Sequence, residues 1–249
     1  MEPTLNHPFN VRSFFTDRER KSIGLGLEVW RGYFQSVRPG IGKMLINVDI
    51  STGLMYKAGP LIQTCLEFFK RPGDPKILST TSGMPDRDRI RLSRFIAGMR
   101  IVINSGDPKV ANVTRVVKRL SSAGANQLSF TLRDGGSMTV ADYFKKQRNR
   151  PLQYPDLLCV EVGAGALIPL ELCHVPPGQI VRKQVPPEKT KDVLDFATKR
   201  PEDRLRSIAN GVDVSLSSPL RFCTRMLLTA FARCRFFSMG NLITCASLG

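Results

Sequence analysis

Zinc-binding spacings and export signals are missing from this sequence of 249 residues. Its six cysteines never form a C-x-x-C pair and it has only two histidines, which excludes zinc sites of the usual spacing. The first twenty residues lack the apolar core of a secretory signal peptide. No stretch reaches the ~18 apolar residues that a membrane span needs. We therefore expect free thiols in a reducing compartment, cytoplasmic or nuclear, and no membrane partner.

Acidic residues are also scarce relative to basic ones. The chain has 37 Lys and Arg against 21 Asp and Glu, a formal charge of +16 and a pI near 10.1. Such a balance predicts a polyanionic partner, of which nucleic acid is the commonest. A basic protein without a specific ligand is the alternative that composition alone leaves open. The apolar fraction of 42% is ordinary and allows at least one packed core.

The first third of the chain predicts a β-hairpin followed by a helix. Apolar and polar residues alternate over 27–37 and again over 44–50, and a turn containing Pro and Gly at 38–42 separates the two runs. Residues 61–69 have the apolar spacing of a short helix. Residues 70–83 are rich in Pro, Gly, Ser and Thr, and we place a domain boundary there.

Residues 98–200 predict a small β-barrel with an inserted lobe that carries a helix, so the fold class is α+β and mainly β. The helix covers 139–146, with Thr139 near its N-cap. Two further helices are expected at 188–199 and 201–208, whereas 215–249 shows no periodicity. The expected barrel strands cover residues 99–103, 110–117, 128–132, 157–162 and 167–172.

Basic and aromatic side chains are interleaved within this barrel region. Cations neutralise phosphates, and aromatic faces stack on unpaired bases, so the mixture is typical of sites for single-stranded nucleic acid. A purely structural interpretation places Phe130 and Phe144 in a core and the basic run 145–150 on a solvated face. Tyr154 favours a ligand contact more strongly, because it lies in a loop between Pro151 and Pro155.

Two groups of segments resemble eukaryotic Argonautes, and fungal or plant members most. Residues 27–39 (LEVWRGYFQSVRP), 45–51 (LINVDIS) and 59–61 (GPL) are similar to the first linker domain of that family. Argonautes share a second domain, the PAZ domain, with Dicer proteins, but this linker match favours Argonaute.

The following segments resemble the PAZ domain. They are 138–144 (MTVADYF), 152–160 (LQYPDLLCV) and 168–173 (IPLELC). The resemblance implies an OB- or SH3-like barrel with an appendage, preceded by the hairpin-and-helix linker domain. The cleft between barrel and appendage would receive the 3′ end of a small guide RNA.

The resemblance also implies a domain order and an absence. The MID and PIWI domains, which hold the guide 5′ phosphate and cleave the target, have no counterpart in the sequence, so we expect a truncated chain that is not an enzyme. The expected divisions are a remnant of the N-terminal domain (1–22), linker 1 (23–73), PAZ (84–200), the start of linker 2 (201–214) and an unrelated, disordered tail (215–249).

The resemblance assigns roles to five residues. Tyr154 would contact the terminal phosphate, and Phe130 would flank the terminal base. Leu170 would line the cleft, and Arg182 and Lys183 would lie near the guide backbone.

Three departures from the PAZ pattern predict weaker binding of the RNA 3′ end than in a complete PAZ pocket. Gln153 stands where the family has Lys or Arg, and Arg148 replaces an upstream tyrosine or histidine, although it can still neutralise the phosphate. A shortened strand leaves Lys109 as its one cation.

The expected partners are a small single-stranded guide RNA and other silencing proteins, with no cofactor. An enzyme remains a rival class, but the acidic residues show no metal-site spacing, and His174 has no nucleophile signature beside it. A non-functional or regulatory fragment that acts only through protein contacts is the third class.

Overall fold

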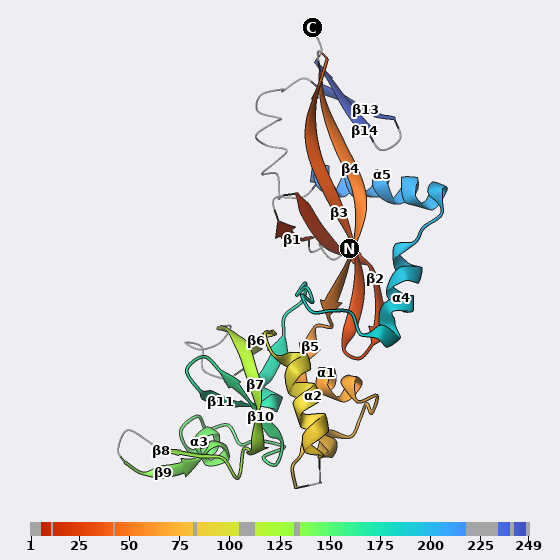
Figure 1. The fold of residues 1–249 in the computed structure, drawn as a ribbon. Coiled ribbons are helices and arrows are strands. Elements are labelled where there is room, and N and C mark those ends of the chain that lie inside the picture. The colour runs from red at the N-terminus through yellow and green to blue at the C-terminus, as the bar shows by residue number, and fades with distance from the viewer. Residues whose placement is uncertain are drawn as a thin grey trace. The chain divides into compact units, whose positions relative to one another are not determined.

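The computed structural model describes residues 6–10, 12–41, 43–81, 84–104, 113–131, 135–217, 234–239 and 242–247. These residues form two compact units (Figure 1). The first unit comprises 1–23, 28–55 and 180–249, and the second comprises 24–27 and 56–179. In the described parts of the chain, no helix combines the length and apolar character that crossing a membrane requires.

The first unit is built on a six-stranded sheet in the order β1-β2-β3-β4-β14-β13. The hairpin predicted from the alternation at 27–50 is present as β3 and β4, and both strands are longer than the pattern indicates. The strands are β1 (Asn6–Asn10), β2 (Ser13–Gly24), β3 (Leu27–Gly40), β4 (Lys43–Tyr56), β13 (Cys234–Met239) and β14 (Leu242–Ser247).

Aromatic residues fill the core of this sheet. Phe15, Trp30 and Met55 are buried together. Gly32 and Gly53 make room for the Phe15 ring, because a Cβ atom at either position would lie 2.4 or 2.5 Å from ring carbons. The close fit of three neighbouring strands therefore depends on two residues without side chains.

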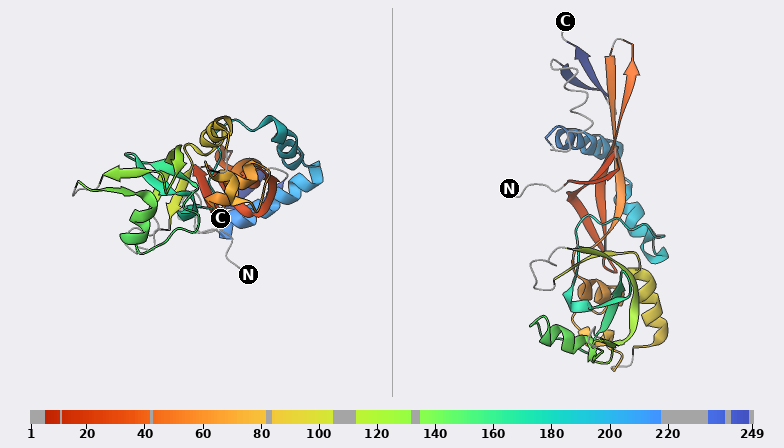
Figure 2. Two further views of the ribbon diagram at one scale, coloured as in Figure 1. Left: turned by 90° about the horizontal axis from the view of Figure 1, so that it is seen from below. Right: turned by 90° about the vertical axis from the view of Figure 1, so that its left-hand side faces the viewer.

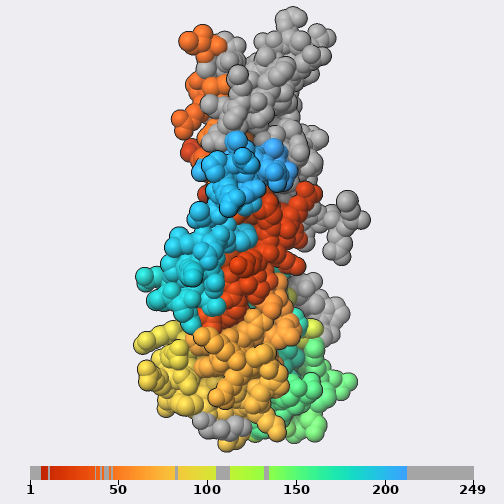
Figure 3. Space-filling model, turned by 90° about the vertical axis from the view of Figure 1, so that its right-hand side faces the viewer, coloured from red at the N-terminus to blue at the C-terminus, as the bar shows by residue number. Residues whose placement is uncertain are grey.

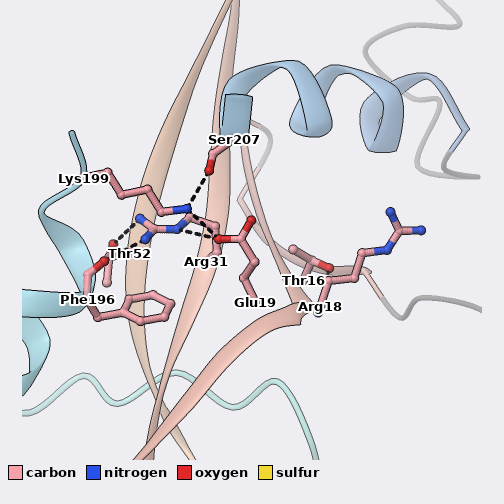
Figure 4. A network of polar contacts seen from close by, with 8 residues as sticks. All are labelled: Thr16, Arg18, Glu19, Arg31, Thr52, Phe196, Lys199 and Ser207. Carbon is pink, nitrogen blue, oxygen red and sulfur yellow. Dashed lines mark hydrogen bonds and ion pairs between the residues drawn. The ribbon is translucent and has the colours of Figure 1, made fainter. Parts of the chain in front are cut away.

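Two helices cover the first unit, and a buried arginine joins one of them to the sheet. They are α4 (Thr190–Ala197) and α5 (Pro201–Ser217), which lie beside the strands in Figure 3. Arg31 on β3 is 1% exposed. Its Nη2 donates to the Phe196 carbonyl (2.7 Å) and its Nη1 to Thr52 Oγ1 (3.1 Å), and its guanidinium lies 4.6 Å from the centre of the Phe196 ring (Figure 4).

A glutamate completes this polar network, which we call the Arg31 network. Glu19 Oε2 on β2 lies 3.5 Å from Arg31 Nε and 2.9 Å from Lys199 Nζ (Figure 4). Lys199 also donates to Ser207 Oγ on α5 (2.6 Å). The network therefore connects three strands with the segment that contains both helices.

The C-terminal segment differs from its expected disorder where the structure describes it. Residues 234–239 and 242–247 form β13 and β14, and β14 continues the sheet by pairing antiparallel with β4. Backbone pairing along the edge of a sheet does not require a regular side-chain pattern, which explains why periodicity gave no signal.

The second unit contains another six-stranded sheet, in the order β11-β10-β7-β6-β12-β5. The long strand β7 pairs with β6 near its start and with β10 further along, and both pairings are antiparallel. The mainly β class is confirmed, and in the described residues the strand order is that of an open sheet. Its strands are β5 (Gly59–Pro60), β6 (Arg100–Ile103), β7 (Thr114–Gly124), β10 (Leu158–Val162), β11 (Ala166–Pro169) and β12 (Cys173–Val175).

Helices and an inserted lobe flank this second sheet. The lobe, here called the appendage, comprises β8 (Ser129–Thr131), β9 (Ser137–Thr139) and α3 (Val140–Lys146) between β7 and β10. Helix α2 (Asp86–Ile96) and the appendage lie on different sides of β7 and β10 (Figure 2). Helix α1 (Leu61–Phe68) buries Leu61, Cys65 and Leu66.

The compact units divide the chain at other positions than the sequence expectation. Helix α1, expected within the linker domain 23–73, belongs to the second unit, and residues 180–200, expected within 84–200, belong to the first. The physical reason is packing: α1 contacts β5 and β12 of the second sheet, whereas the Phe196 carbonyl accepts from Arg31 on β3 and Lys199 donates to Glu19 on β2.

Candidate nucleic-acid interface

The appendage begins its helix with the cap that the sequence predicts. Thr139 Oγ1 accepts a hydrogen bond from the Asp142 backbone N–H (3.1 Å) and donates to the Asp142 carboxylate (3.0 Å). The negative charge of Asp142 also suits the first turn of a helix. One face of α3 is thereby turned to the sheet, where Val140 and Phe144 are buried together with Cys159 and Leu172.

A cavity of about 530 Å³, here called the appendage cavity, lies between the appendage and the second sheet. Its volume falls within the range of about 300–1,000 Å³ that is usual for ligand sites. Most of the lining is apolar, and Arg148 is the one charged residue among the described residues that line it. The lining residues are Ile103, Phe130, Val140, Tyr143, Phe144, Arg148, Ala164, Gly165, Ala166, Leu167 and Ile168.

Three aromatic rings and one cation define the appendage side of the cavity. The rings of Phe130 and Tyr143 meet edge to face with centres 5.5 Å apart, and Tyr143 and Phe144 are related in the same way. The Arg148 guanidinium lies 5.9 Å from the centre of the Tyr143 ring. Aromatic faces beside a cation suit a nucleotide, because the base stacks while the guanidinium neutralises its phosphate.

Tyr154 is half-buried and lies outside the lining of this cavity. Its loop is held by Glu171, whose two carboxylate oxygens accept the backbone N–H groups of Gln153 (3.0 Å) and Tyr154 (2.8 Å). The loop is therefore fixed to the start of the short 3-10 helix Leu170–Leu172.

Of the other predicted site residues, the described ones, Leu170, Arg182 and Lys183, are not among the lining residues of the cavity. Leu170 is fully buried and is not a lining residue, so its side chain supports the core, in contrast to its expected place in the cleft. Arg182 and Lys183 are exposed and belong to the first unit. Partial desolvation of the otherwise exposed Lys183 side chain lowers the pKa of its ammonium. Lys109 lies outside the described residues.

Of the predicted site residues, the structure thus brings Phe130 and Arg148 together. The sequence alone does not assign Tyr143 or the β10–β11 region at 164–168 to the site. Tyr143 could have been found from helical spacing, because it follows Val140 by three residues and therefore shares its face of α3. The 164–168 contribution depends on the pairing of β10 with β11 and had no local signal.

The described residues provide neither a metal-binding cluster nor a reactive thiol. No group of three or more His, Cys, Asp or Glu side chains is placed there to hold a metal ion. Cys65, Cys159 and Cys173 are buried, and burial raises the pKa of the Cys65 and Cys159 thiols to about 12. They stay protonated at neutral pH and pack as small apolar side chains.

Comparison with known families matches two domains in the expected order. The Argonaute linker 1 domain matches residues 11–57, and the PAZ domain matches residues 77–193. Both are non-catalytic domains of larger proteins. Together with the mainly β fold and the appendage cavity, they define a PAZ-domain protein. The chain belongs to the Argonaute family.

Individual relatives agree with this assignment. The chain is 32% identical over 208 residues to the protein argonaute of Schizosaccharomyces pombe, covering 81% of the chain, and 31% identical over 209 residues to argonaute 12 of rice, covering 82%. It spans 24% and 19% of the length of these two proteins.

Solved structures are also similar to this chain. Kluyveromyces polysporus Argonaute, solved with a guide RNA, is similar with a TM-score of 0.60 at 18% identity, over 87% of this chain and 25% of that one. The Drosophila Argonaute 2 PAZ domain, studied for 3′ end recognition of nucleic acids, is 32% identical over 49% of this chain and 97% of its own, with a TM-score of 0.39.

Proposed function

We propose that this chain binds the 3′ end of a small single-stranded guide RNA in RNA-mediated gene silencing and catalyses no reaction itself. The observation that carries the proposal is the appendage cavity, in which Phe130, Tyr143 and Arg148 combine aromatic faces with a cation. The terminal base would stack on the aromatic face, and Arg148 would neutralise the phosphate of the same nucleotide. We also assign a phosphate contact to Tyr154, because it lies in the segment 152–160 that resembles the PAZ domain.

Fluorescence anisotropy with a short 5′-labelled RNA tests the proposal. We expect tighter binding to RNA with a free 3′ terminus than to the same RNA blocked by a bulky 3′ group. Phe130→Ala should weaken binding about tenfold, because stacking contributes about 1–3 kcal/mol per base. Arg148→Ala should lower the salt dependence of binding, because a phosphate contact is lost.

Matched variants outside the cavity control for charge and hydrophobicity. Phe9→Ala removes an exposed aromatic side chain and Arg206→Ala an exposed cation, both in the first unit. Both should bind like the unaltered chain. Equal affinity for free and blocked 3′ ends, or equal losses in the cavity and control variants, would refute the proposal.

A further inference from the structure

In the described residues, the two six-stranded sheets have four edge strands, β1 and β13 in the first unit and β11 and β5 in the second. An edge strand presents a row of unpaired backbone N–H and C=O groups, which proteins protect with proline, bulges, charge or short length. Strand β1 contains Pro8, and its register with β2 shifts between Pro8 and Asn10. Strand β11 ends at Pro169, and the two residues of β5 are Gly59 and Pro60. Three of the four edges are therefore protected against pairing with a further strand.

Strand β13 lacks each of these protections. Its six residues, CRFFSM, include no proline, no lysine and no acid, and Arg235 is the one charged residue among them. All six residues pair with β14 in an unbroken register, from Cys234 opposite Ser247 to Met239 opposite Leu242. A regular, largely apolar strand without proline is the kind that pairs readily along its free edge.

The register also fixes which backbone groups of β13 point to the free edge. Only two residues separate Met239 from its partner Leu242, and the residues that flank a two-residue hairpin loop exchange hydrogen bonds with each other. Hydrogen-bonded and non-hydrogen-bonded pairs alternate along an antiparallel ladder. The N–H groups of Phe237 and Met239 therefore point toward β14. Those of Phe236 and Ser238 point toward the free edge.

We propose that β13 pairs antiparallel with β13 of a second copy of this chain, so that the first-unit sheets of two copies join edge to edge. Two identical strands related by a two-fold axis satisfy this pairing, because each copy donates and accepts at the same residues. The assembly ends at two copies, because the other edge of each joined sheet is β1 with Pro8 and its register shift. The dimer does not depend on the RNA site, since β13 belongs to the first unit and the appendage cavity to the second.

Net charge gives this dimer a salt dependence opposite to that of RNA binding. Each copy carries a formal charge of +16, so two copies repel each other at low ionic strength. Backbone hydrogen bonds between strands involve no net charge, and added salt screens the repulsion. Salt should therefore strengthen the dimer, whereas it weakens the binding of a phosphate backbone. Copies that were merely bridged by RNA would separate as salt is added.

Sedimentation equilibrium of the full chain, freed of nucleic acid by nuclease, measures the assembly. Between about 1 and about 200 µM, a range that covers weak to moderate self-association, we expect the mass to rise from 27.7 kDa to about twice that value. The dissociation constant of the dimer should fall about threefold between about 50 and about 300 mM salt.

A proline at the free edge tests the pairing residue by residue. Ser238→Pro removes an N–H that points to the free edge and leaves those that face β14. Each dimer loses one hydrogen bond from either copy, so we expect the dissociation constant to rise at least about tenfold. Ser238→Thr is the matched control, because it changes the same side chain, keeps the N–H and should dimerise like the unaltered chain. Emission of Trp30 during thermal unfolding checks that the first unit of each variant is folded.

Amide hydrogen exchange of the unaltered chain tests the same pairing without a substitution. Raising the chain concentration should slow exchange at Phe236 and Ser238, and should leave the amides of Phe237 and Met239, which bond to β14, unchanged. The proposal would be overturned by the mass of one chain at every concentration, by a dimer that salt weakens, or by assemblies larger than two copies. Equal dissociation constants for Ser238→Pro and the unaltered chain, or slowed exchange confined to β1, would overturn it as well.

Discussion

Glu171 holds the loop that carries Tyr154 by accepting two successive backbone N–H bonds. A carboxylate that receives two amides fixes a loop more firmly than one neutral bond does, because hydrogen bonds to charged groups are the stronger ones. The backbone of the loop that carries Tyr154 is therefore held in place by Glu171, although Tyr154 is not a lining residue of the appendage cavity.

Removing this carboxylate should free the loop. In Glu171→Ala, we expect amide hydrogen exchange at Gln153 and Tyr154 to accelerate about tenfold, because each lost bond is worth about 1.5 kcal/mol. Mass-resolved or NMR-detected exchange measures this change. Asp195→Asn, which alters an exposed carboxylate in the first unit, should leave both amides unchanged. Unaltered exchange in Glu171→Ala would contradict the role given to Glu171.

His7 should make the first unit less stable in mild acid. Burial lowers the pKa of His7 below its ordinary value of 6.5, against the opposing charge of Asp17. The unfolded chain thus binds the proton more readily, so stability is complete above about pH 6.5 and declines as the pH falls toward the lower folded pKa. Denaturant unfolding between about pH 7.5 and 5.5 measures the decline.

Trp30 is the one tryptophan of the chain and packs edge to face with His7 at 5.3 Å, so its emission reports this unit. His7→Phe should flatten the pH dependence while keeping the ring contact. The other histidine provides the control: His174→Gln should keep the full dependence. An identical decline in His7→Phe would refute the assignment.

The resemblance to the PAZ pattern, and not local composition, singled out Phe130 and Arg148, since composition alone favoured a core for Phe130 and a solvated face for the run 145–150. Both residues line the appendage cavity. Leu170 carried no signal that separates a buried leucine from a cleft-lining one. Exposure is set by how strands pack, which no single residue reveals.

At the scale of elements, helix α3 sets the shape of the appendage cavity. Its seven residues are short for an autonomous helix, so it depends on its cap and on packing. Thr139 supplies the cap and Val140 and Phe144 the packing.

Loss of the cap should loosen both the helix and the site. Thr139→Ala should destabilise the second unit by about 1 kcal/mol, the usual value for an N-cap, and weaken RNA binding because Tyr143 moves with the helix. Thr139→Ser keeps the hydroxyl and should restore both properties. Thermal unfolding and RNA titration of the two variants measure the effects, and equal behaviour of Ala and Ser would exclude the cap as the cause.

The sequence predicted the secondary-structure elements better than it predicted which elements pack against one another. The hairpin β3–β4, the cap of α3 and the appendage inserted between β7 and β10 all follow from local patterns. The attachment of α1 to the second unit does not, because its apolar face would fit either sheet. The pairing of β14 with β4 likewise arises from backbone groups at a strand edge and leaves no periodic trace.

On the scale of the whole molecule, each compact unit has its own source of stability. The Arg31 network stabilises the first unit, whereas burial of apolar side chains against the second sheet stabilises the second unit. The formal charge of +16 is a property of the entire chain. It favours a polyanionic partner but does not show where that partner binds. The particular partner therefore has to be argued from the cavity.

Breaking the Arg31 network should unfold the first unit selectively. Arg31→Ala leaves the Phe196 carbonyl and Thr52 hydroxyl without this buried donor and should cost on the order of 3 kcal/mol. Emission of Trp30 follows the first unit, and binding of the short RNA follows the second. The control Arg206→Ala removes an arginine whose side chain is 76% exposed and should change neither. Loss of RNA binding together with unaffected emission would contradict this division of stability.

The most direct test of RNA 3′-end binding is photo-crosslinking from a single nucleotide. An RNA carrying 4-thiouridine at its 3′ terminus is irradiated with the chain, and the attached peptide is identified by mass spectrometry. We expect attachment within 130–148 or 164–168, and loss of that attachment when the label is moved to the 5′ end. Attachment confined to the first unit, or the same pattern from both labels, would contradict the account.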